Sequence, residues 1–383
     1  MILENAMVFQ GQEGFLPGSV CVENGRFARV RCKKAPGSSP AAGEEECLDM
    51  QGAYLIPGLI DLHIHGSMGC DFSDGAYEGL VTMGRYLAQN GVTSFLPTSM
   101  TLPYETLDRA WQTAGRYVRE MPEKAARILG VHMEGPFFSE KKKGAQNGAY
   151  LKEPDAAAVR RLDGQCGGLL RIVDAAPELP GAAEFARELC GEYLVSAAHT
   201  DAGYEDAAAF FRAGAAHLTH LFNAMPGLHH REPGVIGAAA EDEKVSAELI
   251  CDGMHVHPSA VRAAFKLFPG RLCLVSDALR CCGMPDGTYE LGGQTVYLKD
   301  NVARLGDGTI AGAASCLYDD MRNAVRFGIP ARDAVMAATI VPAQAIGCEK
   351  EVGSIEAGKW ADFVVCDRKL APLQVYIGGK RVR

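Results

Sequence analysis

The chain has 383 residues, of which 48% are hydrophobic and 22% are charged. A chain of this size can bury a large core without support from disulfides or structural metals. Lys and Arg number 38 against 47 Asp and Glu, which gives a net charge of −9. This balance disfavours a nucleic-acid backbone as the main partner.

Thirteen cysteines are spread through the chain without a Cys-x-x-Cys ladder, which favours reduced thiols over a disulfide framework. The opening residues carry acids and lack the basic start and apolar run of a signal peptide. No stretch of about 18 apolar residues follows. We therefore expect a cytoplasmic protein without a membrane span.

Apolar and polar residues alternate over the first fifty residues, and this period of two predicts antiparallel β-structure. Asn24-Gly25 separates two such runs and predicts a hairpin turn. A stretch rich in Pro, Gly, Ser and Ala follows at Ala35 to Gly43, and an acidic run follows at Glu44 to Glu46. These two segments predict a solvated linker.

From Tyr54 onward, short apolar runs alternate with amphipathic stretches, a pattern typical of βα units around a parallel sheet. Helical stretches include Tyr77 to Gln89, Pro103 to Glu120 and Ala182 to Leu189. The predicted strands are Leu59 to His65, Val92 to Thr98, Arg127 to Glu134, Leu169 to Ala175, Tyr193 to His199, Ala216 to Phe222, Val245 to Cys251 and Leu272 to Ala278. Eight such units favour an α/β fold, a (β/α)₈ TIM-like barrel, with an open doubly wound sheet as the alternative.

A β-hairpin pattern between Thr288 and Leu305 interrupts the eighth unit, and helices are predicted at Cys316 to Phe327 and Ala331 to Ile346. The chain then returns to strands at residues 361–366 and 375–380, which would pair with the N-terminal β segment. We expect a small discontinuous β-sandwich domain built from residues 1–53 and 348–383. A catalytic barrel would occupy residues 54–347.

Metal-binding side chains fall at the C-terminal ends of five predicted strands. His63 and His65 are two apart on one strand, so their rings share a face. The other strand ends carry Glu134, His199, His220 and Asp277. Because barrel active sites lie at the carboxyl ends of the strands, we expect these six residues to meet and bind a divalent metal. Imidazole and carboxylate without thiolate suit Zn²⁺ or Fe²⁺.

Other reactive residue types predict plainer roles. His132 lies deeper on the face of Glu134, where a supporting or core role is expected, and Cys281-Cys282 is expected to pack. The run Lys141 to Lys143 predicts a solvated loop, with attraction of an anion to the mouth of the barrel as the alternative. Ordinary hydrogen-bonded roles are expected for His217, His229, His230 and His257. The chain contains no Walker loop, no GxGxxG after a strand and no GxSxG, which argues against nucleotide hydrolysis, dinucleotide cofactors and serine esterase chemistry.

Four segments and the tail resemble the N-acetylglucosamine-6-phosphate deacetylases, a family of the amidohydrolase superfamily. These segments are Pro57 to Gly66, His132 to Phe137, His220 to Met225, Cys251 to Pro258 and Gly358 to Asp362. The similarity runs in order through nearly the whole chain. It implies an enzyme that hydrolyses the acetamide of N-acetylglucosamine 6-phosphate to glucosamine 6-phosphate and acetate, in amino-sugar catabolism or recycling.

The resemblance also implies a metal arrangement. Glu134, His199 and His220 would hold one ion. His63 and His65 would hold a second ion, with Glu134 bridging the two and Asp277 closing the site. Asp277 would be catalytic, since the matching aspartate takes a proton from the attacking water and delivers it to the departing sugar nitrogen.

The substrate contacts implied by the resemblance are Asn223, the backbone at Ala224, Arg231, His255 and Gln146, which stands where some members have histidine. In relatives the arginine reaches a neighbouring subunit, which implies a homodimer. The segment Ala311 to Leu317 departs from the family pattern and alters the acyl pocket. Alternatives are a related amidohydrolase acting on N-acetylgalactosamine 6-phosphate or on another N-acyl or cyclic amide, and a non-catalytic sugar-phosphate-binding barrel.

Overall fold

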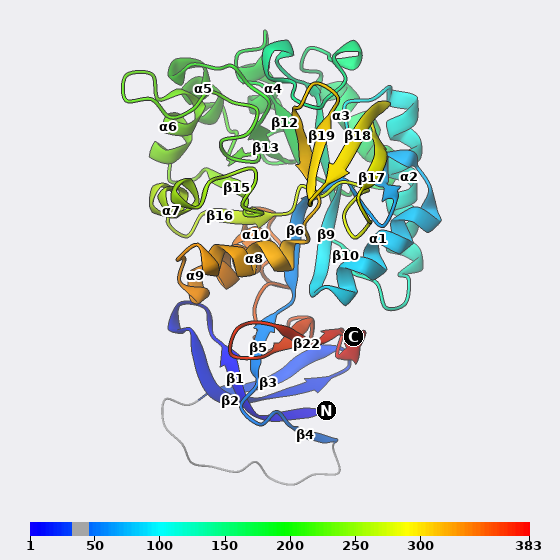
Figure 1. Ribbon diagram of the computed structural model, residues 1–383, viewed down its shortest axis with the longest axis vertical. Helices are drawn as coiled ribbons and strands as arrows, with labels where there is room; N and C mark the ends of the chain where they lie inside the picture. Colours follow the sequence, from blue (N-terminus) through cyan, green and yellow to red (C-terminus); the bar gives the residue numbers. More distant parts are fainter. Residues whose placement is uncertain (33–45) are drawn as a thin grey trace.

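A parallel barrel forms the larger part of the computed structural model, which describes residues 1–32 and 46–383 (Figure 1). Its strands, in order around the barrel, are β6 (Leu59–Ile64), β9 (Val92–Ser99), β11 (Val131–Phe137), β12 (Leu170–Ala175), β13 (Leu194–Ala197), β14 (His217–Leu218), β15 (Ser246–Ile250) and β16 (Leu272–Val275). A parallel bridge between Ile64 and Ala278 links the end of β16 back to β6. The predicted TIM-like barrel is confirmed, and the open doubly wound sheet is wrong.

Helices pack around the barrel with one apolar face inward. In α2, the predicted period of three to four residues buries Leu107, Ala110, Trp111 and Ala114 against the strands. The helices are α1 (Tyr77–Gln89), α2 (Tyr104–Glu120), α3 (Ala156–Cys166), α4 (Ala182–Leu189), α5 (Tyr204–Arg212), α6 (Gly234–Glu241), α7 (Pro258–Leu267), α8 (Leu317–Arg326), α9 (Ala331–Ala337) and α10 (Ile340–Ala345). None of these described helices has the length and apolar character needed to span a lipid bilayer.

Three predicted elements are shorter than expected or divided. The strand predicted at Arg127 to Glu134 is split into β10 (Arg127–Ile128) and β11. The strand predicted at Ala216 to Phe222 keeps only the two residues of β14, because His220 and Phe222 turn into left-handed backbone with φ of 28° and 78°. The helix predicted at Ala331 to Ile346 breaks into α9 and α10, because Pro342 lacks the amide hydrogen that a continuous helix needs.

Both ends of the chain join one mixed sheet, in the order β23-β22-β21-β5-β1-β2-β3, with β4 beside β1 (Figure 1). Its strands are β1 (Ile2–Phe9), β2 (Phe15–Glu23), β3 (Arg26–Cys32), β4 (Cys47–Asp49), β5 (Tyr54–Pro57), β21 (Phe363–Cys366), β22 (Pro372–Ile377) and β23 (Lys380–Arg381). Antiparallel pairing of β5 with β21 brings the two ends together as predicted. The domain boundaries stay a proposal, since β5 leads directly from this sheet into the barrel.

The predicted Asn-Gly turn joins β2 and β3, with φ of 51° at Asn24 and 77° at Gly25. Left-handed backbone at both positions is what this hairpin type requires. The linker predicted at Ala35 to Gly43, and most of the acidic run after it, lie outside the described residues.

The predicted hairpin after the eighth strand extends to a four-stranded antiparallel meander. It comprises β17 (Gly287–Leu291), β18 (Gln294–Lys299), β19 (Val302–Leu305) and β20 (Ile310–Ala313). Leu291, Val296 and Leu298 pack with Leu279, which follows β16. The remaining short elements are β7 (Gly66–Ser67), β8 (Cys70–Asp71) and the 3₁₀ turns Gly11–Glu13, Phe72–Asp74, Glu140–Lys142 and Gly148–Tyr150.

Candidate active site

The six predicted metal ligands meet at the carboxyl end of the barrel. His63 lies near the end of β6 and His65 just beyond it, while Glu134 lies within β11. His199, His220 and Asp277 are each the second residue after a strand, following β13, β14 and β16. The five histidine and glutamate side chains are almost fully buried, and the side chain of Asp277 is 13% exposed.

Glu134 is the centre of this arrangement. Its Oε1 lies 3.0 Å from Nε2 of His199 and 3.2 Å from Nε2 of His220. Its Oε2 lies 3.2 Å from Nε2 of His65. One carboxylate therefore reaches histidines from three different strands, which is the placement that a bridging ligand needs.

Asp277 contacts the pair His63 and His65, which Glu134 also contacts. Its Oδ1 is 3.3 Å from Nε2 of His65 and 3.6 Å from Nε2 of His63. The same two nitrogens face Glu134, so the pair is enclosed by carboxylates on two sides.

Three of the four histidines have the proton of their other ring nitrogen fixed by an acceptor. Nδ1 of His65 donates to the carbonyl oxygen of Thr98 at 3.1 Å, and Nδ1 of His199 donates to that of Lys142 at 3.0 Å. Nδ1 of His63 lies 2.9 Å from the carboxylate of Glu248. These acceptors leave the Nε2 lone pairs directed inward.

The residues fit one or two divalent ions. Nε2 of His63 lies 3.3 Å from Nε2 of His65, and Nε2 of His199 lies 3.1 Å from that of His220. Two nitrogens that each lie about 2.1 Å from one tetrahedral ion are about 3.4 Å apart. The observed spacings therefore suit two nitrogens that share one ion, and the buried clusters around Glu134 are consistent with a metal site.

The electrostatics also favour positive charge at this point. Burial alone lowers the pKa of His65, but Asp277 and Glu134 outweigh it and raise the pKa to about 10. Burial alone raises the pKa of Glu134, but His63 and the other histidines hold it well below its ordinary value. The carboxylates are therefore ionised and can bind a cation. A metal ion and protons would compete for the same histidine nitrogens.

The backbone is strained where it presents three of these side chains. His199, His220 and Asp277 have φ of 44°, 28° and 49°. Left-handed backbone at residues other than glycine costs on the order of 1–3 kcal/mol each and is concentrated at functional sites. The turn after each strand brings the side chain to the cluster, within 3.0–3.3 Å of Glu134 or His65.

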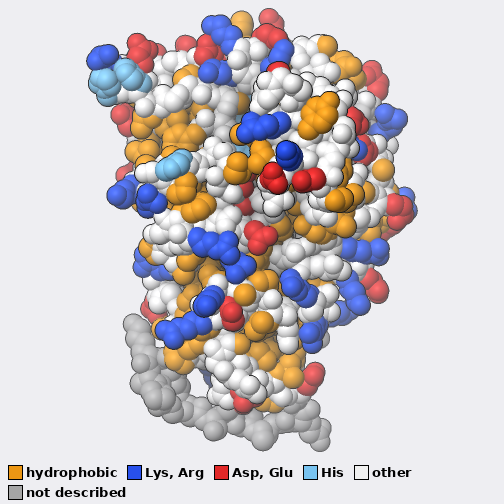
Figure 2. Space-filling view, viewed as in Figure 1, with side chains coloured by type: hydrophobic (Ala, Val, Ile, Leu, Met, Phe, Trp, Pro, Cys, Tyr) orange, Lys and Arg blue, Asp and Glu red, His pale blue; other side chains and the backbone are white. Residues whose placement is uncertain are grey.

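A cavity of about 320 Å³ opens above the cluster, within the range of small-molecule sites of about 300–1,000 Å³. The predicted substrate residues Asn223, Ala224, His255 and Gln146 line it, together with His65, Glu134, His199, His220 and Asp277. Arg231 does not line it and instead lies exposed, with its guanidinium 2.8 Å from Nε2 of His230. On the face shown in Figure 2, Lys and Arg side chains occur singly and in small groups.

Four residues around the cluster have roles that differ from those predicted or that were not predicted. Lys141 and Lys142, expected in a solvated loop, line the cavity. Gln146 donates to Oε2 of Glu134 at 2.6 Å, so it contacts a candidate ligand directly. Glu248 has no role in the sequence predictions beyond its place in the strand Val245 to Cys251. Its signal was a charged side chain inside an otherwise apolar run, Ala247-Glu248-Leu249-Ile250.

The remaining histidines and cysteines have the plain roles expected of them. His132 bonds to the carbonyl oxygen of Leu62 and to Asp174. His257 caps α7 by accepting from the backbone N of Ser259. Cys281 and Cys282 are buried, and none of the thirteen cysteines, all of them described, is in a disulfide.

Comparison with known proteins agrees with this geometry. The amidohydrolase family matches residues 54–382. The N-acetylglucosamine-6-phosphate deacetylase of Bacillus subtilis (strain 168) is 35% identical over 95% of this chain and 92% of its own length. The N-acetylgalactosamine-6-phosphate deacetylase of Escherichia coli O157:H7 is 37% identical over 85% of this chain and 87% of its own length.

A solved structure is also similar over the whole chain. It is a mutant of the N-acetyl-D-glucosamine-6-phosphate deacetylase of Mycobacterium smegmatis in complex with N-acetyl-D-glucosamine-6-phosphate. It aligns with a TM-score of 0.91 and 32% identity, covering 100% of this chain and 99% of that chain. The chain belongs to the amidohydrolase family. The Bacillus subtilis and Escherichia coli relatives described above are deacetylases of N-acetylhexosamine 6-phosphates.

Proposed function

We propose that the chain is a metal-dependent deacetylase that converts N-acetylglucosamine 6-phosphate to glucosamine 6-phosphate and acetate, in amino-sugar catabolism or recycling. The observation that carries this proposal is the single cavity shared by five of the six candidate metal ligands and by Asn223, Ala224 and His255. We place the enzyme in the cytoplasm, where its thirteen thiols stay reduced.

The metal would be Zn²⁺ or Fe²⁺, because the donors are imidazoles and carboxylates. Glu134, His199 and His220 would hold one ion, and His63, His65 and Asp277 would hold a second, with Glu134 shared. When bound, such ions lower the pKa of water and stabilise negative charge on a carbonyl oxygen.

Asp277 supplies the acid-base chemistry in this proposal. Burial alone raises its pKa, but His63 and His65 hold the pKa below its ordinary value, so the carboxylate is ionised at neutral pH. It accepts a proton as water adds to the acetamide carbon, and it returns that proton to the sugar nitrogen as the carbon–nitrogen bond breaks. Acetate and the free amine are the products.

The phosphate would contact Asn223, the backbone N of Ala224 and His255. Asp252 orients His255, since its Oδ2 lies 2.7 Å from Nδ1 of that ring. Arg231 lies outside the cavity of its own chain, so we propose that it serves the cavity of a second subunit in a homodimer. Arginine suits this role because its planar guanidinium can grip two phosphate oxygens.

The test is a substrate panel of N-acetylglucosamine and N-acetylgalactosamine, each with and without the 6-phosphate, with acetate release and metal content measured together. We expect acetate release from N-acetylglucosamine 6-phosphate that is lost on chelation and restored by Zn²⁺ or Fe²⁺. The Arg231→Met variant should raise KM for the phosphorylated sugar much more than for the unphosphorylated one.

Metal-loaded protein that releases no acetate from any phosphorylated sugar would contradict the proposal and favour a non-catalytic sugar-phosphate-binding barrel. A higher kcat/KM for N-acetylgalactosamine 6-phosphate would support the second candidate, which the Escherichia coli relative motivates. One metal equivalent that stays at one after reconstitution would rule out the pair of ions.

A further inference from the structure

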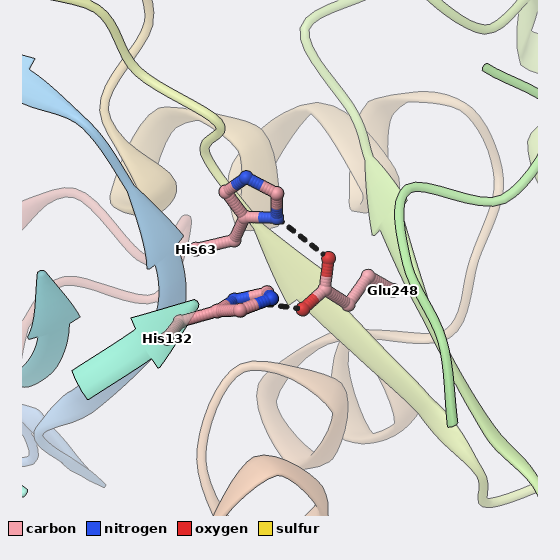
Figure 3. Close-up of side chains that lie close together, drawn as sticks. All are labelled: His63, His132 and Glu248. Carbon is pink, nitrogen blue, oxygen red and sulfur yellow. Dashed lines mark hydrogen bonds and ion pairs between the residues drawn. The ribbon is translucent and has the colours of Figure 1, made fainter. Parts of the chain in front are cut away.

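Glu248 lies beneath the candidate metal ligands, in the middle of β15, and its side chain is fully buried. Its Oε2 accepts from Nδ1 of His63 at 2.9 Å and from the backbone N of His220 at 3.2 Å. Its Oε1 lies 3.4 Å from Nε2 of His217. Figure 3 shows His63 and Glu248 pointing toward each other across the barrel interior. One carboxylate therefore contacts a residue from each of the two candidate ion positions.

We infer that Glu248 is a positioning residue that orients His63 and His220 for metal binding. A carboxylate oxygen accepts a hydrogen bond, so it fixes the proton of His63 on Nδ1 and leaves the Nε2 lone pair toward Glu134 and Asp277, each 3.6 Å away. A carboxylate partner also makes an imidazole a more basic ligand. The inference rests on the proposed metal ligands and not on the identity of the substrate.

His220 depends on Glu248 for a different reason. Its φ of 28° is strained for a residue with a side chain. Among the described residues, nothing bonds to its Nδ1, so no acceptor behind the ring sets its orientation. The hydrogen bond from its backbone N to Glu248 therefore carries much of the positioning of this ligand.

A third ion is the competing interpretation, because His63, His132 and Glu248 offer ligand atoms close to one another (Figure 3). The hydrogen bonds of His132 argue against it. Its Nδ1 donates to the carbonyl oxygen of Leu62 at 3.0 Å, and its Nε2 lies 3.0 Å from Oδ1 of Asp174. With both ring nitrogens engaged, His132 has none left for a metal, and the cluster is a hydrogen-bond network.

The test variant is Glu248→Gln, which keeps the size of the side chain but replaces one acceptor oxygen by a donor. In one orientation of the amide, the new NH₂ group faces the Nδ1–H of His63 and the backbone N–H of His220. In the other orientation, it faces the ring of His217. We expect the affinity for Zn²⁺, measured by competition with a chromophoric chelator, to fall about 10–100-fold. The visible absorption bands of the Co²⁺-substituted protein should shift, because the orientation of the ligands changes.

Asp174→Asn is the matched control. Asp174 is a fully buried carboxylate on β12 that bonds to His132 and Thr219 and to none of the six candidate ligands. This variant should keep the Zn²⁺ affinity and Co²⁺ spectrum of the unchanged protein. If Glu248→Gln does not fold, Glu248→Asp carries the test, since it keeps the charge but withdraws it by one methylene and should still weaken Zn²⁺ binding.

Unchanged Zn²⁺ affinity in the folded Glu248 variants would overturn the inference, and so would an equal loss in Asp174→Asn. A third metal equivalent that disappears in Glu248→Gln would overturn it in favour of an ion at His63, His132 and Glu248. If the unchanged protein bound no divalent metal, the proposed ligand set itself would fail. The metal titration of the unchanged protein therefore separates the two failures.

Discussion

Asp277 differs from the other five candidate ligands in being partly open to the cavity. Its side chain is 13% exposed, against 7% or less for the five others. Asp277 contacts only the pair His63 and His65, whereas Glu134 lies between that pair and the pair His199 and His220. A group that exchanges protons with a substrate needs this access, whereas a bridging ligand needs enclosure.

Replacing Asp277 by asparagine should therefore abolish turnover more than it removes metal. The amide keeps the size of the side chain but cannot accept and return a proton, and acid-base catalysis contributes about 10²–10⁴-fold to rate. We expect kcat to fall by at least about 100-fold while five other ligands retain the metal. Steady-state kinetics with metal analysis of the same sample checks this, and near-normal kcat would refute the assigned role.

The candidate ligands could be predicted from sequence because each lies at the end of an apolar run. Of the residues that support them, His132 could be placed, because it lies two residues before Glu134 on the same strand. The others could not, since a polar residue without such a neighbour gives no sign of the side of the strand on which it lies. The structure shows that His132, Asp174, Ser196, His217 and Glu248 lie in five consecutive barrel strands, and all are fully buried. To recognise from sequence that these five residues lie together, one would need to know how neighbouring strands are aligned. The alternation of apolar and polar residues within one strand does not give that alignment.

Elements that end at the site were predicted less well than those that cover it. The predicted bounds of α1 and α4 agree with the structure, because their apolar faces repeat over two or more turns. In contrast, β14 was predicted five residues too long, because hydrophobic periodicity does not register the left-handed turn at His220. Departures from regular structure at a functional site are where local patterns fail.

Helix α8 carries a buried acid, which makes its packing sensitive to pH. Asp320 lies in the first turn and is fully buried. The hydroxyl of Ser315 offsets only part of the cost of burying its charge. Burial raises the pKa of Asp320 well above its ordinary value, and the charge of Asp252 adds to the rise. Folding therefore favours the neutral acid.

Asp320→Asn should stabilise the protein increasingly as pH rises. A folded-state pKa above the unfolded one means that the folded protein binds more protons, so stability falls as pH rises between these two values, by about 1.4 kcal/mol per pH unit. Asparagine removes that dependence. Melting temperatures at pH 5 and pH 8 should therefore differ less in the variant.

Asp319→Asn is the control for this variant, because the neighbouring Asp319 side chain is 67% exposed. It should leave the pH dependence of melting unchanged. A stability difference between Asp320→Asn and the unchanged protein that is the same at both pH values would contradict the argument.

At the scale of the whole molecule, the small sheet lies below the barrel in Figure 1 and contacts it at the start of β10. Arg127, at the start of β10, donates from Nε to Oδ2 of Asp362 at 2.9 Å, and Asp362 immediately precedes β21. The guanidinium of Arg127 lies 4.1 Å from the centroid of the Trp360 ring, and that of Arg26 from β3 lies 4.2 Å from it. These contacts join the two sheets.

Arg127→Met should destabilise the protein without impairing catalysis. The variant keeps apolar contact with Trp360 but leaves the carboxylate of Asp362, which is 5% exposed, without its counter-charge. Removing one partner of a buried pair costs about 3–5 kcal/mol, chiefly because the other charge stays buried. The double variant Arg127→Met with Asp362→Asn should recover part of this loss. Urea titrations of the single and double variants measure both effects.

The activity of Arg127→Met should not change. Because active sites of these barrels lie at the carboxyl end of the strands, kcat/KM measured well below the unfolding transition should equal that of the unchanged protein. A large fall would show that the interface with the small sheet also shapes the metal site.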